Sequence, residues 1–272
     1  MYSAHMTTSP VSAAPHRESQ GSGPSLVLLH ANGGDHRDFD AVAPALAESG
    51  WRVTTLDWPG HGRSPRSEPE TAVGFGQLLV RMLDDLGGEH VLLGNSVGGF
   101  AALYAAAHRP DRVAGLVLVS PGGFSPQWIG TTLACRAIGS RRLAPAAYRN
   151  LPRLYLRGRN AGVAAAIERA AQAARSPERA AVYASVWRSF THPDHDGRPL
   201  AADVRCPTLL AWGTRDPILP WRLDGRRARA ALPNAQVVTF AGAGHQPFIE
   251  RPGEFLDRTA PFLTGLRTAM SQ

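Results

Sequence analysis

Short apolar runs alternate with longer amphipathic stretches along most of this chain. The apolar runs are rich in Val and Leu and mostly lack polar alternation, which is typical of strands buried on both faces. They lie at residues 25–30, 52–56, 90–94, 114–119, 208–212 and 236–240. Helical patterns lie between them, near residues 37–49, 71–86, 97–108, 221–231 and 252–267. This alternation predicts an α/β fold in which helices wrap a mostly parallel sheet.

The alternation stops after Val119 and resumes at Cys206. The residues in between favour helices. Ser125-Pro126 and Ser176-Pro177 combine a good capping residue with a proline suited to the first helical position, and residues 161–174 are rich in alanine. The pattern therefore predicts several helices in place of the next strand.

These patterns predict how the chain is organised. We expect residues 123–200 to form a helical cap, or lid, inserted into an α/β core of residues 25–122 and 201–272. Residues 1–24 are rich in Ser, Pro, Ala and Gly. We expect that segment to be a flexible N-terminal tail.

Composition narrows the class of protein. The chain has 272 residues, of which 43% are hydrophobic and 19% are charged, which excludes disordered, collagen-like and disulfide-stapled proteins. No run of about 18 apolar residues is present, so we expect no membrane span. Cys135 and Cys206 lie far apart and form no metal-binding pattern. Because residues 1–24 lack the apolar segment of a secretory signal, we expect a cytoplasmic protein.

Positive charge is concentrated in the predicted cap. The net charge is +7, and every one of the 29 basic residues is an arginine. Residues 123–200 contain 12 of these arginines but only four acidic residues. Two interpretations are open: a solvated surface in a protein biased toward arginine, or the attraction of an anionic substrate or partner. No nucleic-acid recognition motif accompanies the charge, so we expect no nucleic-acid partner.

A candidate nucleophile lies between a predicted strand and a predicted helix. Residues 94–98 read GNSVG and match G-x-S-x-G. In a strand–turn–helix context this motif forms a tight turn that exposes the central serine, here Ser96, above the sheet. Small residues at positions 94 and 98 allow the strand and the helix to pack closely against the turn.

A candidate acid and a candidate base follow in the chain. Asp216 comes just after the predicted strand at 208–212, and His245 comes just after the one at 236–240. The carboxyl ends of parallel strands meet at one edge of the sheet, where ligands bind. A serine needs a base to become a good nucleophile, and the order Ser, Asp, His is the one expected on this architecture. We therefore predict a catalytic triad of Ser96, Asp216 and His245.

The loop after the first predicted strand is a candidate oxyanion hole. Residues 30–34 read HANGG, and the glycines allow the chain to approach a reacting carbon closely. We predict that the backbone N–H groups of Asn32 and Val97 form the oxyanion hole.

Together these motifs resemble the α/β-hydrolase fold superfamily, in its serine-nucleophile esterase branch. The resemblance extends from about residue 25 to about residue 266. Its motifs are HANGG (30–34), DWPGHGRS (57–64), GNSVGG (94–99), HRPDRVAGLVLVSP (108–121), WGTRDPILP (212–220) and GAGHQPFIERP (242–252). The resemblance implies a helical lid at the insertion and a structural role for His61 and Arg63. Members usually have two or three further strands before the first one identified here, and residues 1–24 do not supply them convincingly.

The resemblance implies a serine hydrolase that cleaves a carboxylic ester, thioester or lactone through an acyl-enzyme. Because this mechanism uses only protein groups and water, we expect that it needs no metal and no cofactor. We expect its substrate to be a small acyl compound, and an anionic acyl group or one carried by an acyl-carrier protein fits the positive charge of the predicted cap. Phe124, Trp128 and Trp187 are candidate lining residues of an apolar acyl pocket. Two alternatives remain open: a carbon–carbon bond hydrolase of the ring-fission-product type, in which Trp usually stands where this chain has Gln246, and a non-catalytic receptor on the same fold. The oligomeric state stays open.

Overall fold

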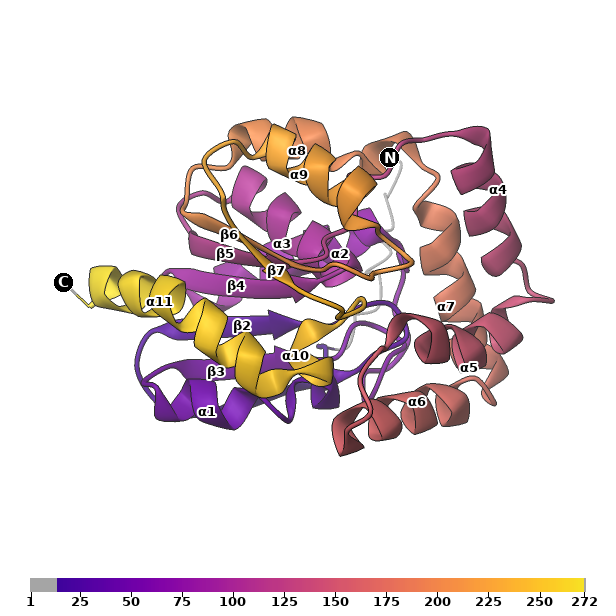
Figure 1. Ribbon diagram of the computed structural model, residues 1–272, viewed down its shortest axis with the longest axis horizontal. Helices are drawn as coiled ribbons and strands as arrows, with labels where there is room; N and C mark the ends of the chain where they lie inside the picture. The colour runs from indigo at the N-terminus through magenta and orange to yellow at the C-terminus, as the bar shows by residue number, and fades with distance from the viewer. Residues whose placement is uncertain (1–13, 272) are drawn as a thin grey trace, which may run out of the picture.

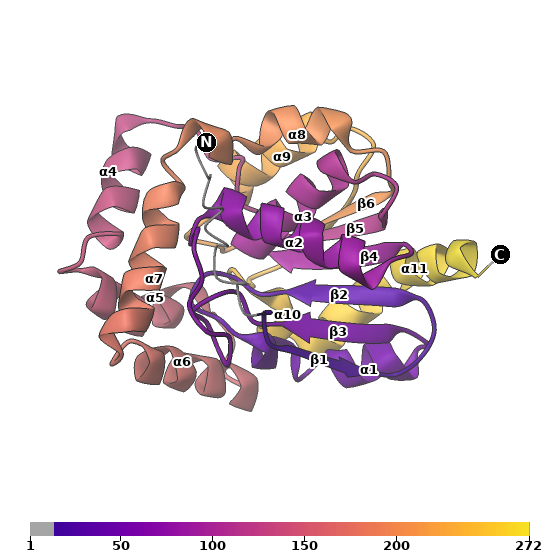
Figure 2. The same ribbon diagram turned by 180° about the vertical axis from the view of Figure 1, so that it is seen from behind.

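The computed structural model describes residues 14–271, which form a seven-stranded sheet covered by helices on both faces (Figures 1 and 2). The strand order is β1-β3-β2-β4-β5-β6-β7, and only β1 runs antiparallel to its neighbour. All six strands expected from the apolar runs are present. The strands are β1 (Arg17–Gln20), β2 (Ser25–Leu29), β3 (Arg52–Leu56), β4 (His90–Asn95), β5 (Val113–Val119), β6 (Thr208–Gly213) and β7 (Gln236–Phe240).

The strand β1 departs from the expected flexible tail over residues 1–24. Residues 17–20 pair with β3, from Arg17 opposite Leu56 to Gln20 opposite Val53. All four residues of β1 are exposed and none is apolar. The backbone ladder therefore holds this edge strand without the apolar pattern that marks the others. Residues 1–13 of the expected tail lie outside the described residues.

Helices form one layer on each face of the sheet. On one face lie α2 (Ala72–Leu86), α3 (Val97–His108), α8 (Gly197–Asp203) and α9 (Arg226–Ala231), and on the other lie α1 (Ala43–Glu48) and α11 (Pro252–Met270). Successive residues of β2 enter the two cores in turn: Val27 and Leu29 pack toward α2 and α3, and Leu26 and Leu28 pack toward α11. This double burial explains the continuous apolar runs.

Four helices lie together beyond the carboxyl ends of the strands (Figures 1 and 2). They are α4 (Ile129–Ile138), α5 (Ala144–Tyr155), α6 (Ala161–Ala173) and α7 (Pro177–Ser189). A small core of their own joins them, in which the rings of Tyr148 and Tyr183 stack at 4.4 Å. The last helix of the insertion, α8, packs instead against α3 of the core. The expected cap boundary at residue 200 falls inside α8.

The two predicted helix starts have different outcomes. The start at Ser176-Pro177 is confirmed, because α7 begins at Pro177 and the Ser176 hydroxyl accepts from the Arg179 N–H. The start at Ser125-Pro126 is wrong. The Ser125 hydroxyl donates instead to the buried Asp224 carboxylate of the core.

Short helical turns complete the described part of the chain. They are η1 (His36–Phe39), η2 (Pro193–His195), the π-helical turn η3 (Trp221–Gly225) and α10 (Pro247–Glu250). None of the described helices combines the length and the apolar character that crossing a membrane requires.

Candidate active site

Ser96 lies in a strained turn between β4 and α3. Its backbone angles are φ 55° and ψ −116°, a left-handed conformation that side chains rarely adopt. The turn closes tightly: a Cβ at position 94 would collide with the Gly98 carbonyl, and a Cβ at position 98 with the Leu29 carbonyl. Ser96 is partly exposed, whereas the residues on either side of it are buried. The turn therefore presents the Ser96 side chain above the sheet.

Asp216 and His245 form a buried pair at the same sheet edge. Asp216 follows β6, and its Oδ1 accepts the N–H groups of Ile218 at 2.8 Å and Leu219 at 3.0 Å. Its Oδ2 lies 2.6 Å from His245 Nδ1. A carboxylate can only accept, so the neutral form of the ring carries its proton on Nδ1 and keeps the lone pair on His245 Nε2. This is the imidazole state that a general base needs.

The main chain around His245 is held by Glu250, a residue that the sequence reasoning missed. Glu250 is buried, and its Oε2 accepts the N–H groups of Gly244 at 2.8 Å and Arg157 at 3.0 Å. Its Oε1 accepts the Gln246 N–H at 3.1 Å. The carboxylate thus binds the residues on both sides of His245 and joins them to the insertion. The only signal in the sequence was an acidic residue at the end of the otherwise apolar segment PFIE.

Two further contacts position His245. Its N–H donates to the Tyr155 carbonyl at 2.9 Å, at the end of α5. Its carbonyl accepts from Asn95 Nδ2 at 3.1 Å, and Gln246 Nε2 donates to Asn95 Oδ1 at 3.0 Å. Gln246 and Asn95 therefore tie the loop that carries His245 to the end of β4.

The loop after β2 is anchored by imidazoles. His30 Nε2 accepts the Trp58 N–H at 3.0 Å, and His61 Nε2 lies 3.1 Å from Asn32 Oδ1. Burial lowers the pKa of His61 to about 3, so this ring is neutral near pH 7. The Asn32 amide also donates to the Tyr183 carbonyl of α7 at 3.2 Å. The structural role expected for His61 is therefore to hold Asn32.

One cavity of about 320 Å³ brings the candidate residues together. Ser96, Val97, Asn32 and His245 all contribute to its lining, under α4 and α7 of the insertion. Its remaining walls are largely apolar. Such a space suits a small, mainly apolar substrate.

The three expected lining aromatics have different environments. Trp187 of α7 lines the cavity. Phe124 does not, because it is fully buried in the core beside α3. Trp128 does not either, since 62% of its surface is exposed on the outside of the insertion. An aromatic residue type therefore does not by itself predict whether the side chain lies in the cavity, in the core or on the surface.

His195, which the sequence reasoning did not select, also lines the cavity. Its ring lies 4.6 Å from that of Phe100 and 4.8 Å from that of Phe190. Burial lowers the pKa of His195 to about 4, which makes the ring neutral near pH 7. Its Nε2 has no hydrogen-bond partner among residues 14–271.

Comparison with known proteins agrees with this architecture. A family model described as alpha/beta hydrolase fold matches residues 24–252. A pimeloyl-[acyl-carrier protein] methyl ester esterase of Aromatoleum aromaticum is 31% identical, over 84% of this chain and 94% of the relative. A thermophilic esterase from Thermogutta terrifontis superposes with a TM-score of 0.80 at 23% identity, over 93% of this chain and 94% of that one. The enol-lactonase from Burkholderia xenovorans LB400 superposes with a TM-score of 0.72 at 26% identity, over 92% and 96% of the two chains.

A partly exposed serine in a tight turn after a central strand of an α/β sheet is typical of the α/β-hydrolase fold. This chain belongs to the alpha/beta hydrolase fold family, and it is an enzyme of the hydrolase class.

Proposed function

We propose that this protein hydrolyses carboxylic esters through an acyl-enzyme formed on Ser96. The observation that carries the proposal is the bond of 2.6 Å between His245 Nδ1 and Asp216 Oδ2, made beside a cavity that Ser96 and His245 both line. Nucleophile, base and orienting acid come from three different strand ends. A purely structural histidine would have no need to share a cavity with a strained serine.

In the proposed first step Ser96 Oγ attacks the ester carbonyl carbon while its proton passes to His245 Nε2. Asp216 keeps the Nδ1 proton in place and stabilises the imidazolium without taking the proton. The Asn32 and Val97 N–H groups bind the oxyanion, and losing one such donor costs about 2.7–4 kcal/mol of transition-state stabilisation. When the tetrahedral intermediate collapses, the alcohol leaves with the proton from His245.

In the second step water attacks the acyl-enzyme and gives its proton to His245. The second tetrahedral intermediate releases the acid and returns the proton to Ser96 Oγ. All proton transfers use one imidazole, which explains why its loop is held by the carboxylate of Glu250 and by the Tyr155 carbonyl.

Acyl groups with a negatively charged handle are the proposed substrate class. Arg141, Arg142 and Arg149 are exposed on the insertion, and none of them makes an ion pair within the described part of the chain. The relative from Aromatoleum aromaticum is named for an ester on an acyl-carrier protein. Both observations support an anionic or carrier-bound acyl group.

Hydrolysis of p-nitrophenyl esters, from acetate to palmitate, tests the mechanism. We expect turnover that the Ser96→Ala variant loses while keeping the wild-type unfolding curve. The chain length that is hydrolysed fastest reports the depth of the cavity. Retained turnover in Ser96→Ala contradicts the assignment of the nucleophile. If a fluorophosphonate labels Ser96 of the folded wild type but the protein hydrolyses no ester, the proposed substrate class is contradicted. That outcome would favour carbon–carbon bond hydrolysis or a receptor function.

A further inference from the structure

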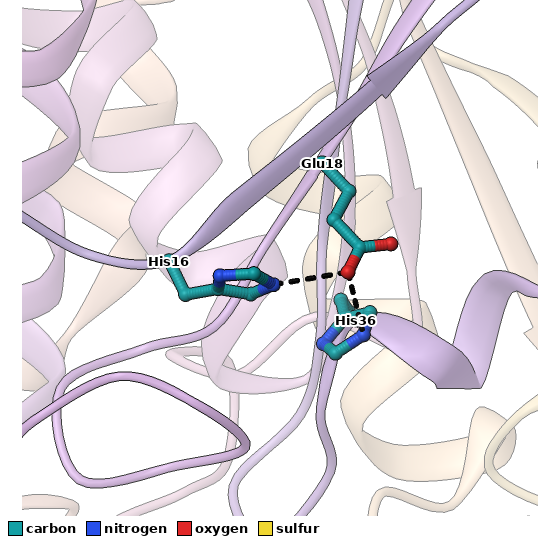
Figure 3. A group of neighbouring side chains, drawn as sticks. All are labelled: His16, Glu18 and His36. Atoms are coloured by element: carbon teal, nitrogen blue, oxygen red, sulfur yellow. Dashed lines mark hydrogen bonds and ion pairs between the residues drawn. The ribbon is translucent and has the colours of Figure 1, made fainter.

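Three potential metal ligands converge at the sheet edge that β1 forms. His16 precedes β1, Glu18 lies within it, and His36 begins η1 (Figure 3). Their ligand atoms all lie within 4.8 Å of one another. We propose that His16, Glu18 and His36 form a binding site for a divalent transition-metal ion, of which Zn²⁺ fits the donor set best.

The spacing of the donor atoms suits tetrahedral zinc. Glu18 Oε1 lies 3.1 Å from His16 Nε2 and 3.5 Å from His36 Nε2. With bonds of about 2.0–2.1 Å, the ligand atoms of a tetrahedral zinc site stand about 3.3–3.4 Å apart. The two separations bracket that value. Two imidazoles and one carboxylate, with water as a fourth ligand, favour zinc over Mg²⁺ or Ca²⁺, which prefer oxygen ligands.

Asp57 prepares His36 for this role. Both of its carboxylate oxygens lie 2.9 Å from His36 Nδ1, and Oδ1 also accepts the His36 N–H at 2.7 Å. The carboxylate can only accept, so Nδ1 carries a proton and Nε2, the nitrogen that faces Glu18, is the one that can bind a metal ion once it is unprotonated. A carboxylate behind a ligating histidine is the usual support of a metal site.

His16 is held in place by a second link to the same loop. Its N–H donates to Ser64 Oγ at 2.8 Å, and the Ser64 hydroxyl donates to the Asp57 carbonyl at 2.7 Å. The His16 and His36 rings meet edge to face at 5.1 Å. The His36 ring and the His16 main chain are therefore both held by the segment around Asp57, which reduces the ordering that a bound ion would have to impose.

Arg63 competes with a metal ion at this site. Its Nη1 lies 2.6 Å from Glu18 Oε1, but 64% of the Arg63 side chain is exposed. Exposed ion pairs contribute little stability, so a bound ion can displace the guanidinium into solvent. Removing Arg63 should therefore tighten metal binding.

Zinc titration of the full chain, prepared without an affinity tag, tests the proposal by calorimetry and thermal unfolding. We expect one equivalent of zinc and a rise in Tm of roughly 5–10 °C at a hundredfold excess over Kd. His16→Ala and Glu18→Gln should each weaken zinc binding by about tenfold or more, since loss of even a residue that only hydrogen-bonds to a metal ligand lowers the affinity by that factor. Arg63→Gln should bind zinc more tightly, because it removes the competing charge and keeps the backbone N–H that Asp57 accepts.

His192 supplies the matched control. This exposed histidine also faces a carboxylate, with Nδ1 3.3 Å from Asp194 Oδ2, yet among the described residues it belongs to no three-ligand group. His192→Ala should bind zinc like the wild type. The proposal is overturned if the wild type binds no zinc, or if His16→Ala and Glu18→Gln bind it unchanged. The readout is binding and not turnover, so its outcome is independent of ester hydrolysis.

Discussion

At the scale of single residues, Glu250 holds the main chain on both sides of the candidate base His245. Its carboxylate accepts three backbone N–H groups, on Gly244, Gln246 and Arg157. A neutral amide in its place offers one accepting oxygen and one donating nitrogen, and the nitrogen would face N–H groups. Glu250 is thus a positioning residue, because it acts on the reaction through His245.

Glu250→Gln should lower kcat much more than it raises KM, and should destabilise the fold by about 1.5–3 kcal/mol, the value of hydrogen bonds to a charged group. Steady-state kinetics on a nitrophenyl ester and urea unfolding measure the two effects. Glu254→Gln is the control, because Glu254 is partly exposed and pairs only with surface arginines. A kcat equal to that of the wild type in Glu250→Gln would refute the positioning role.

His195 should make the fold sensitive to acid. Burial lowers its pKa from 6.5 to about 4, so below pH 6.5 the unfolded chain binds a proton that the folded chain does not. Stability therefore falls as the pH drops from 6.5 toward 4, by up to about 1.4 kcal/mol per pH unit from this one group. His195→Phe should reduce that slope when urea unfolding is compared between pH 8 and pH 4. Parallel curves for the two proteins would contradict the assignment.

At the scale of elements, the turn from β4 into α3 tolerates no added atoms. Gly98→Ala would place a Cβ against the carbonyls of Leu29 and His30 in β2 and its following loop. We expect this variant to lose about 1–3 kcal/mol of stability, the usual cost of overpacking, and to lose activity as Ser96 shifts.

Gly265→Ala is the matched change in open space. Gly265 lies within α11, and a Cβ there meets nothing within 4 Å. The variant should gain about 0.5–1 kcal/mol, because alanine loses less backbone entropy in a helix. Thermal or urea unfolding of both variants checks the pair. Equal effects from the two substitutions would show that close packing at the elbow is not the cause.

At the scale of the whole molecule, the insertion carries the positive charge and also closes the candidate site. Replacing Arg141, Arg142 and Arg149 by Glu should raise KM for an acyl-carrier-protein ester by roughly tenfold or more, since steering by an oppositely charged surface accelerates association to that extent. KM for a neutral nitrophenyl ester should stay the same. Steady-state kinetics at low and high salt measure KM for both esters, and high salt should reduce the difference for the acidic ester only.

The control for that charge reversal is the same change on the core. Arg222, Arg226 and Arg229 are exposed on η3 and α9, and replacing them by Glu alters the net charge equally. If both triple variants raise KM for the acidic ester alike, the effect comes from total charge and not from the insertion.

The sequence by itself determined the six parallel strands β2 to β7, the elbow around Ser96 and the candidates Asp216 and His245. These features follow from local chemistry: continuous apolar runs, glycines where atoms cannot fit, and polar residues directly after strands. The edge strand β1 carries no such mark, because its residues are polar and exposed, and its pairing with β3 depends on backbone bonds that any sequence can make.

Only the tertiary structure decided which distant groups meet. The Tyr155 carbonyl, the Glu250 carboxylate and the Tyr183 carbonyl reach the site from segments whose own patterns show ordinary helices. The same holds for the meeting of His16 and Glu18 with His36, and for the separation of Trp187, in the cavity, from Phe124 and Trp128 outside it. A residue's type and spacing limit its local conformation, but its partners depend on how the elements pack, and that packing is a property of the whole chain.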